Sequence, residues 1–188
     1  MMKRIVLAAL TLAFALLPYS AAVRAADKRK TPEEFRAEMR ANVQGTIDRF
    51  KKTDPGIERF LKESAGYAVF PTVAKMGFVL AGGYGEGEVY DAGKVVGVAS
   101  VSFGSVGLTA GAQEYSEIIF FKDKADLERF KQNKFEFDAA ASAVVWKSGA
   151  AKSANYTGGV AVFVHPKGGV MAEASVGGQK FSFKPEAK

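Results

Sequence analysis

Glycine is concentrated in one stretch of this chain, and this concentration limits the folds open to it. Residues 66–113 contain eleven of the twenty glycines, within segments whose other residues favour β-strands. Glycine weakens an ordinary strand because it has no side chain to pack and loses the most backbone entropy on folding. Strands this rich in glycine therefore require sharp bends, close approach of neighbouring backbone, or space beside the sheet for a bound molecule.

The first 25 residues have the pattern of a secretory signal peptide. Lys3 and Arg4 precede an apolar run over residues 5–17, and small residues follow up to Ala25. The run is shorter than the roughly 20 residues that a spanning helix needs, so we expect cleavage after Ala25 or after Ala22. Removing 25 of the 188 residues leaves 163, and the loss of three basic residues lowers the formal net charge from +6 to +3. We expect an exported periplasmic protein, either free or attached peripherally to an envelope membrane.

Length and composition indicate one domain and exclude several kinds of site. A chain of this size can bury one self-sufficient core, so we expect a single domain over residues 31–188, preceded by a charged leader at residues 26–30. The chain has no cysteine, which excludes a lipidated cysteine, a thiol nucleophile and a cysteine metal site. With His165 as its one histidine, we expect no metal and no cofactor. The modest charge and the export signal disfavour nucleic-acid binding.

Two amphipathic helices are predicted ahead of the glycine-rich stretch. Residues 31–34 (Thr-Pro-Glu-Glu) combine a capping hydroxyl, a proline at the first helical position and acids in the first turn. An apolar stripe then extends along a helix to about Lys52, formed by Phe35, Met39, Val43, Ile47 and Phe50. Asp54 and Pro55 are expected to cap a shorter second helix. Both helices need a sheet to lie on.

From Tyr67 onward the apolar pattern has a period of two, which predicts strands. The predicted strands are residues 67–70, 78–84, 87–90, 95–103, 106–112, 116–121, 135–146, 160–165, 170–176 and 180–183. Residues 91–94 and 166–169 have turn compositions, and Asp123 is expected to cap one short mid-chain helix over residues 123–131. Strands this close in sequence pair antiparallel. We therefore expect an α+β fold with a strongly curved antiparallel sheet or partial barrel.

Two of the predicted strands have no charged face. Val95, Gly97, Ala99, Val101 and Phe103 alternate with Val96, Val98, Ser100 and Ser102, and residues 106–113 are equally uncharged. Both faces are therefore expected to be covered, by helices, by a second layer of sheet or by an apolar ligand. A glycine-kinked sheet wrapped around its own core is the commoner explanation of such a pattern.

Four motifs occur in the same order as in a known family. They are Gly-Tyr-Ala-Val-Phe-Pro at 66–71, Gly-Gly-Tyr-Gly-Glu-Gly at 82–87, the glycine-spaced segment 103–113, and Ala-Ser-Val-Gly-Gly-Gln-Lys-Phe at 174–181. Together they resemble the SYLF domain family over residues 35–183. The resemblance implies a lipid-binding module, because eukaryotic relatives bind phosphoinositide-containing membranes through an N-terminal amphipathic segment and basic residues. Some yeast relatives also bind actin. This chain is similar to the exported, stand-alone bacterial relatives, so no actin role is expected.

The predicted function is therefore non-catalytic binding of a phospholipid or a membrane surface. The candidate binding residues are Lys28, Arg29, Lys30, Phe35, Arg36 and Arg40 from the leader and first helix, and Gly82, Gly83, Tyr84, Gly85, Gly87 and Phe103 from the sheet. One alternative is a structural or protein-interaction module with an envelope protein partner. A second is an envelope hydrolase, built around His165 or on a pair among Glu86, Glu88, Glu114, Glu117 and Glu173. Trp146 is expected in the core.

Overall fold

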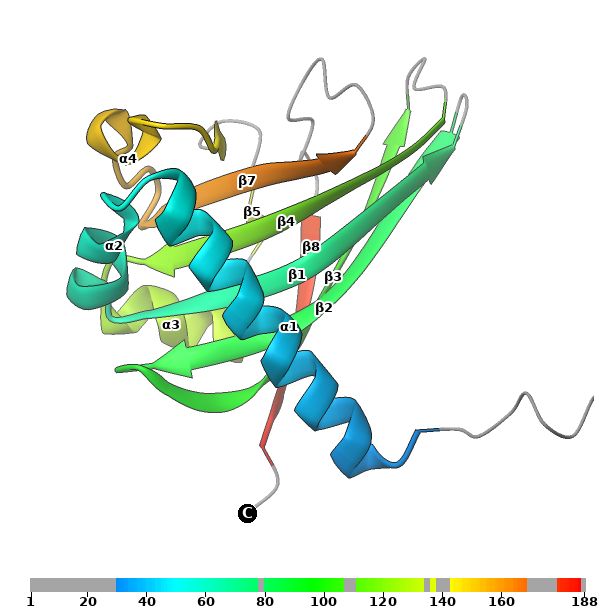
Figure 1. Ribbon diagram of the computed structural model, residues 1–188. Coiled ribbons are helices and arrows are strands. Elements are labelled where there is room, and N and C mark those ends of the chain that lie inside the picture. The colour runs from blue at the N-terminus through cyan, green and yellow to red at the C-terminus, as the bar shows by residue number, and fades with distance from the viewer. Residues whose placement is uncertain are drawn as a thin grey trace, which may run out of the picture.

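The computed structural model describes residues 30–77, 80–106, 111–133, 136–137, 143–168 and 179–186. Within these residues the chain forms four helices and one eight-stranded sheet (Figure 1). The helices are α1 (Pro32–Thr53), α2 (Ile57–Glu63), α3 (Lys124–Lys131) and α4 (Ala150–Ser153). The strands are β1 (Gly66–Gly77), β2 (Leu80–Asp91), β3 (Lys94–Val106), β4 (Gly111–Phe121), β5 (Glu136–Phe137), β6 (Ala143–Val145), β7 (Val160–Gly168) and β8 (Gln179–Pro185).

The predicted α+β class with a curved sheet is confirmed. The strand order is β5-β8-β3-β2-β1-β4-β7-β6, with β5 and β6 at the two outer edges, so the sheet does not close into a barrel. Every described pairing is antiparallel except that of β6 with β7, which is parallel. None of the described helices is long and apolar enough to cross a bilayer.

A bend in β1 and the glycines beside it curve the sheet. The register of β1 shifts around Pro71 against both of its neighbours, because proline has no N–H to donate to the ladder. A Cβ at Gly87 would lie 2.0 Å from the Val69 carbonyl oxygen, and one at Gly83 would lie 2.1 Å from the ring of Phe103. Close approach of backbone and rings therefore accounts for these two glycines.

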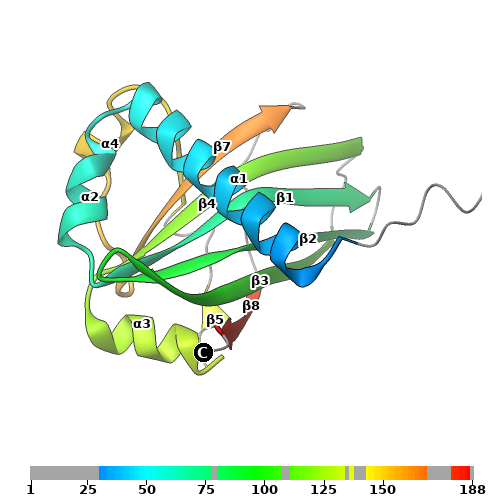
Figure 2. The same cartoon turned by 60° about the horizontal axis from the view of Figure 1, so that its bottom comes forward.

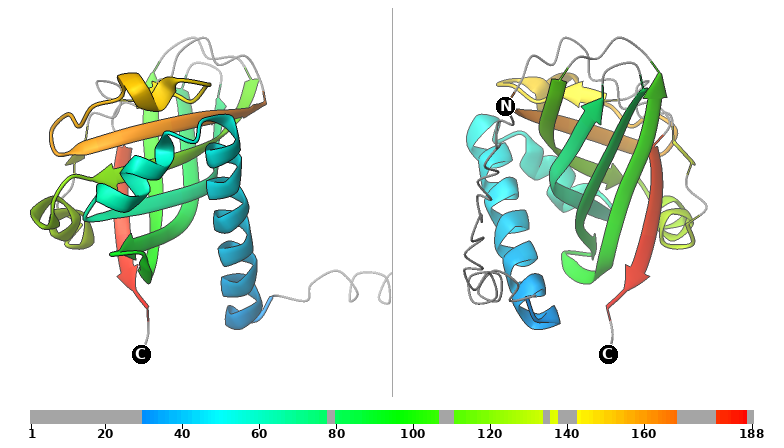
Figure 3. Two further views of the ribbon diagram at one scale, coloured as in Figure 1. Left: turned by 60° about the vertical axis from the view of Figure 1, so that its left-hand side comes forward. Right: turned by 90° about the vertical axis from the view of Figure 1, so that its right-hand side faces the viewer.

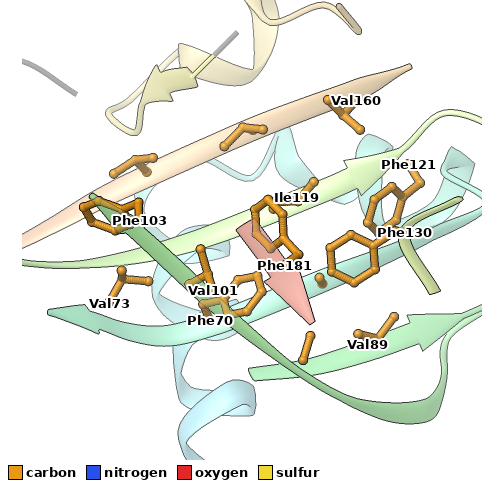
Figure 4. Packing of buried hydrophobic residues seen from close by; sticks show 14 of the residues in the cluster. Phe70, Val73, Val89, Val101, Phe103, Ile119, Phe121, Phe130, Val160 and Phe181 are labelled. Carbon is orange, nitrogen blue, oxygen red and sulfur yellow. The ribbon is translucent and has the colours of Figure 1, made fainter. Parts of the chain in front are cut away.

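The concave face of the sheet holds one apolar core. The rings of Phe70 on β1 and Phe181 on β8 lie 5.9 Å apart, although β2 and β3 separate these strands in the sheet. The sheet must therefore curl until β8 faces β1 across the core (Figure 4). Helix α3 contributes Leu127 and Phe130 to the same cluster.

A second core lies between the convex face and helices α1, α2 and α4. Val43, Ile47 and Phe50 of α1 pack there, and Figure 2 shows α1 crossing β1 and β2 on this face. Trp146 belongs to this core, as predicted, and its indole Nε1 donates to the Phe50 carbonyl oxygen at 3.0 Å. The fold thus has two separate apolar layers on a single sheet.

The predicted helix starts are confirmed at two helices and wrong at a third. Thr31 and Glu34 form a capping box at α1, and Asp123 caps α3 by accepting from the Asp126 N–H at 3.0 Å. Asp54 does not cap α2: its carboxylate accepts from the N–H groups of Gly56 and Ala151, each at 2.9 Å. This carboxylate therefore ties α4 to the start of α2. Helix α4 itself was not predicted.

Several predicted strand boundaries are wrong. Residues 85 and 86 continue β2 as one strand across a predicted break, and β7 extends to Gly168 through the predicted turn. His165 therefore lies within a strand, paired with Ser116 of β4. Among the described residues of the long strand predicted for 135–146, residues 136–137 form β5 and 143–145 form β6. Residues 78–79, 107–110 and the predicted strand 170–176 lie outside the described residues.

Candidate ligand-binding groove

The apolar stripe of α1 is buried at one end and open at the other. Val43, Ile47 and Phe50 lie within the convex-face core, whereas Met39 is half-buried and Phe35 is 42% exposed. Figure 3 shows the N-terminal part of α1 continuing past the strands it packs on. The open part of the stripe faces β2, β3 and β8, where pockets lie between helix and sheet.

These pockets form a groove with apolar side chains at its centre. Two adjoining hollows share Phe35, Met39 and Val98, and Tyr84 lines the second. Val98 is 37% exposed and Tyr84 54%, so the described residues leave this part of the convex face uncovered. The described helices and strands therefore leave Val98 partly uncovered, and an apolar ligand as its cover stays a prediction. We call this site the α1 groove.

Strand β8 supplies the far wall of the α1 groove. Ser182 and Lys184 face the second hollow, and Pro185 and Glu186 face the first. Ser182 pairs with Ser100 of β3, which places β8 directly beside the strand that carries Val98. Val98 and Lys184 were not among the predicted binding residues, because both faces of residues 95–103 were expected to be covered.

Carboxylates neutralise some of the basic residues at the α1 groove. The guanidinium of Arg40 lies 3.7 Å from Glu88 and 3.6 Å from Glu186. Lys30 pairs with Glu38. Arg36 and Lys184 form no ion pair with any of the described residues, so their charges are available to an anion.

Glu88 is the buried carboxylate beneath this end of α1. It is 3% exposed, and besides Arg40 it accepts a hydrogen bond of 2.8 Å from the Tyr90 hydroxyl. Burial of the phenol, together with this bond to a carboxylate, raises the pKa of Tyr90. The Tyr90 hydroxyl therefore stays protonated and remains a donor to Glu88.

Tyr84 makes a similar contact within the groove. Its hydroxyl donates to Glu86 at 2.7 Å, and this bond raises the pKa of Tyr84. Because the hydroxyl is held by its neighbour, the exposed ring is the part of Tyr84 that faces the groove. It presents an apolar surface beside Phe35 and Met39.

The structure brings five of the predicted binding residues to this groove. Phe35, Arg36, Arg40 and Tyr84 line its two hollows, and Lys30 lines a third that shares Phe35 and Val98 with both. The other predicted sheet residues lie elsewhere: Gly82 is exposed on the convex face, and Gly83, Gly85, Gly87 and Phe103 face the concave side. Successive residues of a strand alternate between faces, so Gly83, Gly85 and Gly87 lie on the opposite face from Tyr84. Lys28 and Arg29 lie outside the described residues.

The groups suggested for a hydrolase are distributed over both faces of the sheet. Glu86 and Glu88 lie on the convex side, whereas Glu117 is buried on the concave side. The His165 ring packs 5.7 Å from that of Phe50, and its Nδ1 lies 2.9 Å from the Pro166 carbonyl oxygen. Glu114 is exposed, and Glu173 lies outside the described residues.

Comparison with known proteins supports the family resemblance. Residues 102–188 match the Ysc84 family model, described as "Las17-binding protein actin regulator". The predicted resemblance to the SYLF family is therefore confirmed by a family-model match over residues 102–188. The chain is also 27% identical over 168 residues to Beta cell expansion factor A of Aeromonas veronii. That alignment covers 85% of this chain and 64% of the relative, so about a third of the relative has no counterpart in it.

Proposed function

We propose that this protein is exported and binds an anionic phospholipid surface through the α1 groove, without catalysing a reaction. The observation that carries the proposal is the gathering of Phe35, Tyr84 and Val98 beside Arg36 and Lys184. Apolar side chains exposed singly need no explanation, but a cluster rimmed by polar groups is typical of an interaction site. The family match supports the same class of function through the resemblance described above.

The two kinds of side chain have separate roles in this proposal. Phe35, Val98 and the ring of Tyr84 contact the acyl chains, and transfer of their exposed area out of water gains about 25 cal/mol per Å². Arg36 and Lys184 face the phosphates, and each cation near an anionic surface contributes about 1 kcal/mol. Two available cations give weak, salt-sensitive attraction, so the apolar contacts decide whether the protein stays bound.

Two other roles are not proposed for this chain. The family description names an actin regulator, and export would separate this protein from the cytoskeleton. A purely protein-binding role in the envelope would use the same exposed residues but would require no lipid. The experiment below distinguishes this second role from lipid binding.

Vesicle flotation tests the proposal. The protein without residues 1–25 is mixed with vesicles of phosphatidylcholine alone or with added phosphatidylglycerol, at low and high salt. We expect flotation with the anionic vesicles, reduced by salt and lost in Phe35→Ser, with Arg36→Gln weakening flotation at low salt and making it less sensitive to added salt. The matched control is Met76→Ser, which removes a side chain that is 68% exposed but does not line the α1 groove.

Two results would overturn the proposal. One is the absence of flotation with any of these vesicles at low ionic strength. The other is loss of binding in Met76→Ser with full binding in Phe35→Ser, which would move the contact away from the α1 groove.

A further inference from the structure

A buried polar pair joins β4 to β8 across the concave core. Glu117 on β4 and Gln179 on β8 are 0% and 1% exposed. The Gln179 amide Nε2 donates to Glu117 Oε2 at 2.9 Å and lies 3.5 Å from the Tyr115 hydroxyl. Three strands separate β8 from β4 in the sheet, so these contacts cross the core and do not follow the backbone ladder.

Two of the three side-chain oxygens of this pair have no hydrogen-bond donor. Within the described part of the chain, Glu117 Oε1 and Gln179 Oε1 are buried without a hydrogen-bond partner. A buried acceptor without a partner costs about 1–3 kcal/mol, and more when it is charged. A carboxylate here would therefore carry its charge with a single strong hydrogen bond, which is an unfavourable arrangement.

The surroundings of Glu117 are almost entirely apolar. Glu117 pairs with Phe70 of β1 and Val164 of β7 and belongs to the concave side of the sheet. The other described residues on this side include Lys75 of β1, Tyr115 of β4 and Phe181 of β8. Tyr115 and Lys75 are the ionisable groups among them. Lys75 pairs with Gln113 whereas Glu117 pairs with Phe70, and the causes of the raised pKa of Glu117 are burial and the Gln179 hydrogen bond, without Lys75.

Burial dominates the ionisation of Glu117. Desolvation raises its pKa to about 7, and the hydrogen bond from Gln179 opposes this shift only in part. Burial also raises the pKa of Tyr115, with the Glu117 charge as the second cause, so the phenol stays protonated. At mildly acidic pH the carboxyl group therefore holds a proton.

We propose that Glu117 and Gln179 form a proton-controlled latch between β4 and β8. In the protonated state the Glu117 Oε1–H donates to Gln179 Oε1 while Gln179 Nε2 donates to Glu117 Oε2. The single proton thereby gives both Glu117 Oε1 and Gln179 Oε1 a hydrogen bond, and the carboxylic acid and the amide form a ring with two hydrogen bonds. When the proton leaves, the ring opens and a charged carboxylate stays in an apolar core, which loosens β8.

The latch affects the α1 groove because β8 forms its far wall through Ser182 and Lys184. A looser β8 widens the groove, whatever the ligand is, so the inference does not depend on the proposed function.

The pH dependence of the latch follows from the raised pKa of Glu117. The contribution of protonated Glu117 to folding stability is complete below its unfolded-state pKa of 4.5, and it is lost as the pH rises to about 7. Over that interval the folding equilibrium constant falls about tenfold per pH unit, and it levels off above.

The test compares Glu117→Gln with the wild type by urea unfolding from about pH 5 to about pH 8. The glutamine amide imitates the protonated acid, because it donates to Gln179 Oε1 and accepts from Gln179 Nε2 at every pH. We expect Glu117→Gln to abolish the fall in the folding equilibrium constant, which in the wild type is about tenfold per pH unit up to about pH 7. The matched control is Glu114→Gln, an exposed carboxylate on the same strand, which should keep the wild-type slope.

A second measurement keeps the inference testable if Glu117→Gln fails to fold. In the wild type, carbon NMR should give a titration midpoint near 7 for the Glu117 carboxyl group. Protection of the β8 amides should fall above that midpoint more than that of the β1 amides. A wild-type midpoint near 4.5, or equal slopes in the wild type and Glu117→Gln, would overturn the latch.

Discussion

The two halves of α1 carry the same apolar stripe and meet opposite surroundings. The half with Val43 and Phe50 is closed by aromatic side chains of the sheet, whereas the half with Phe35 and Met39 faces a partly open groove. The closed half belongs to a core that includes Phe120 of β4 and Phe163 of β7, whereas the open half faces Glu86 of β2 and Val98 and Ser100 of β3. An amphipathic stripe thus predicts a helix, but the partner strand decides whether the stripe is core or binding surface.

The largest expected effect is at the closed half. Phe50→Ala should lower the free energy of unfolding by about 3–5 kcal/mol, because it opens a cavity in a filled core. Phe50 is 1% exposed, and its ring lies 5.4 Å from that of Trp146. Urea unfolding followed by Trp146 fluorescence measures this loss directly.

Phe35→Ala is the control at the open half. We expect a change of under about 1 kcal/mol, because the ring is 42% exposed and is not enclosed by the core. Similar losses for the two variants would contradict the division of α1 into a closed and an open half.

The same contrast applies to two glycines of the sheet. Gly87→Ala should cost about 1–3 kcal/mol, since the new methyl group meets the Val69 carbonyl, which is backbone and cannot rotate away. Gly104→Ala meets nothing within 4 Å and should change stability by no more than about 0.5 kcal/mol. Thermal unfolding of both variants is the measurement. If both behave alike, tight backbone approach is not the reason for the glycine at position 87.

The sequence could predict the helices and the curvature because local chemistry determines both. The capping box at Thr31 and the stripe on α1 are local patterns, and repeated glycine in strands has few physical explanations. It could not predict that β6 pairs parallel with β7, because the partner of a short strand depends on distant segments. For the same reason it gave no indication that Asp54 would hold α4 in place of capping α2.

The site could be predicted on the helix better than on the sheet. Phe35, Arg36 and Arg40 follow from the position of an amphipathic turn, and all three line the α1 groove. On the sheet, repeated glycine left sharp bends, close approach and space for a ligand all open, and at Gly83 the space is taken by the ring of Phe103. Lys184 was missed because only the pairing of β8 with β3 brings it beside α1. The Glu117–Gln179 contact, between residues 62 positions apart, likewise depends on how far the sheet curls.

The smallest expected effect concerns the ion pairs that hold the open half of α1. Arg40→Gln should cost about 1 kcal/mol, because it leaves the buried Glu88 with Tyr90 as its described partner and removes the contact with Glu186. The cost stays small because the Arg40 side chain is 58% exposed and water screens its charge. Amide exchange in the first turns of α1 should rise in this variant, while exchange near Val43 stays unchanged. Lys30→Gln breaks a pair that is exposed on both sides, so we expect no measurable change in stability. Equal exchange rates in the two variants would mean that Arg40 does not hold this half of α1 over the groove.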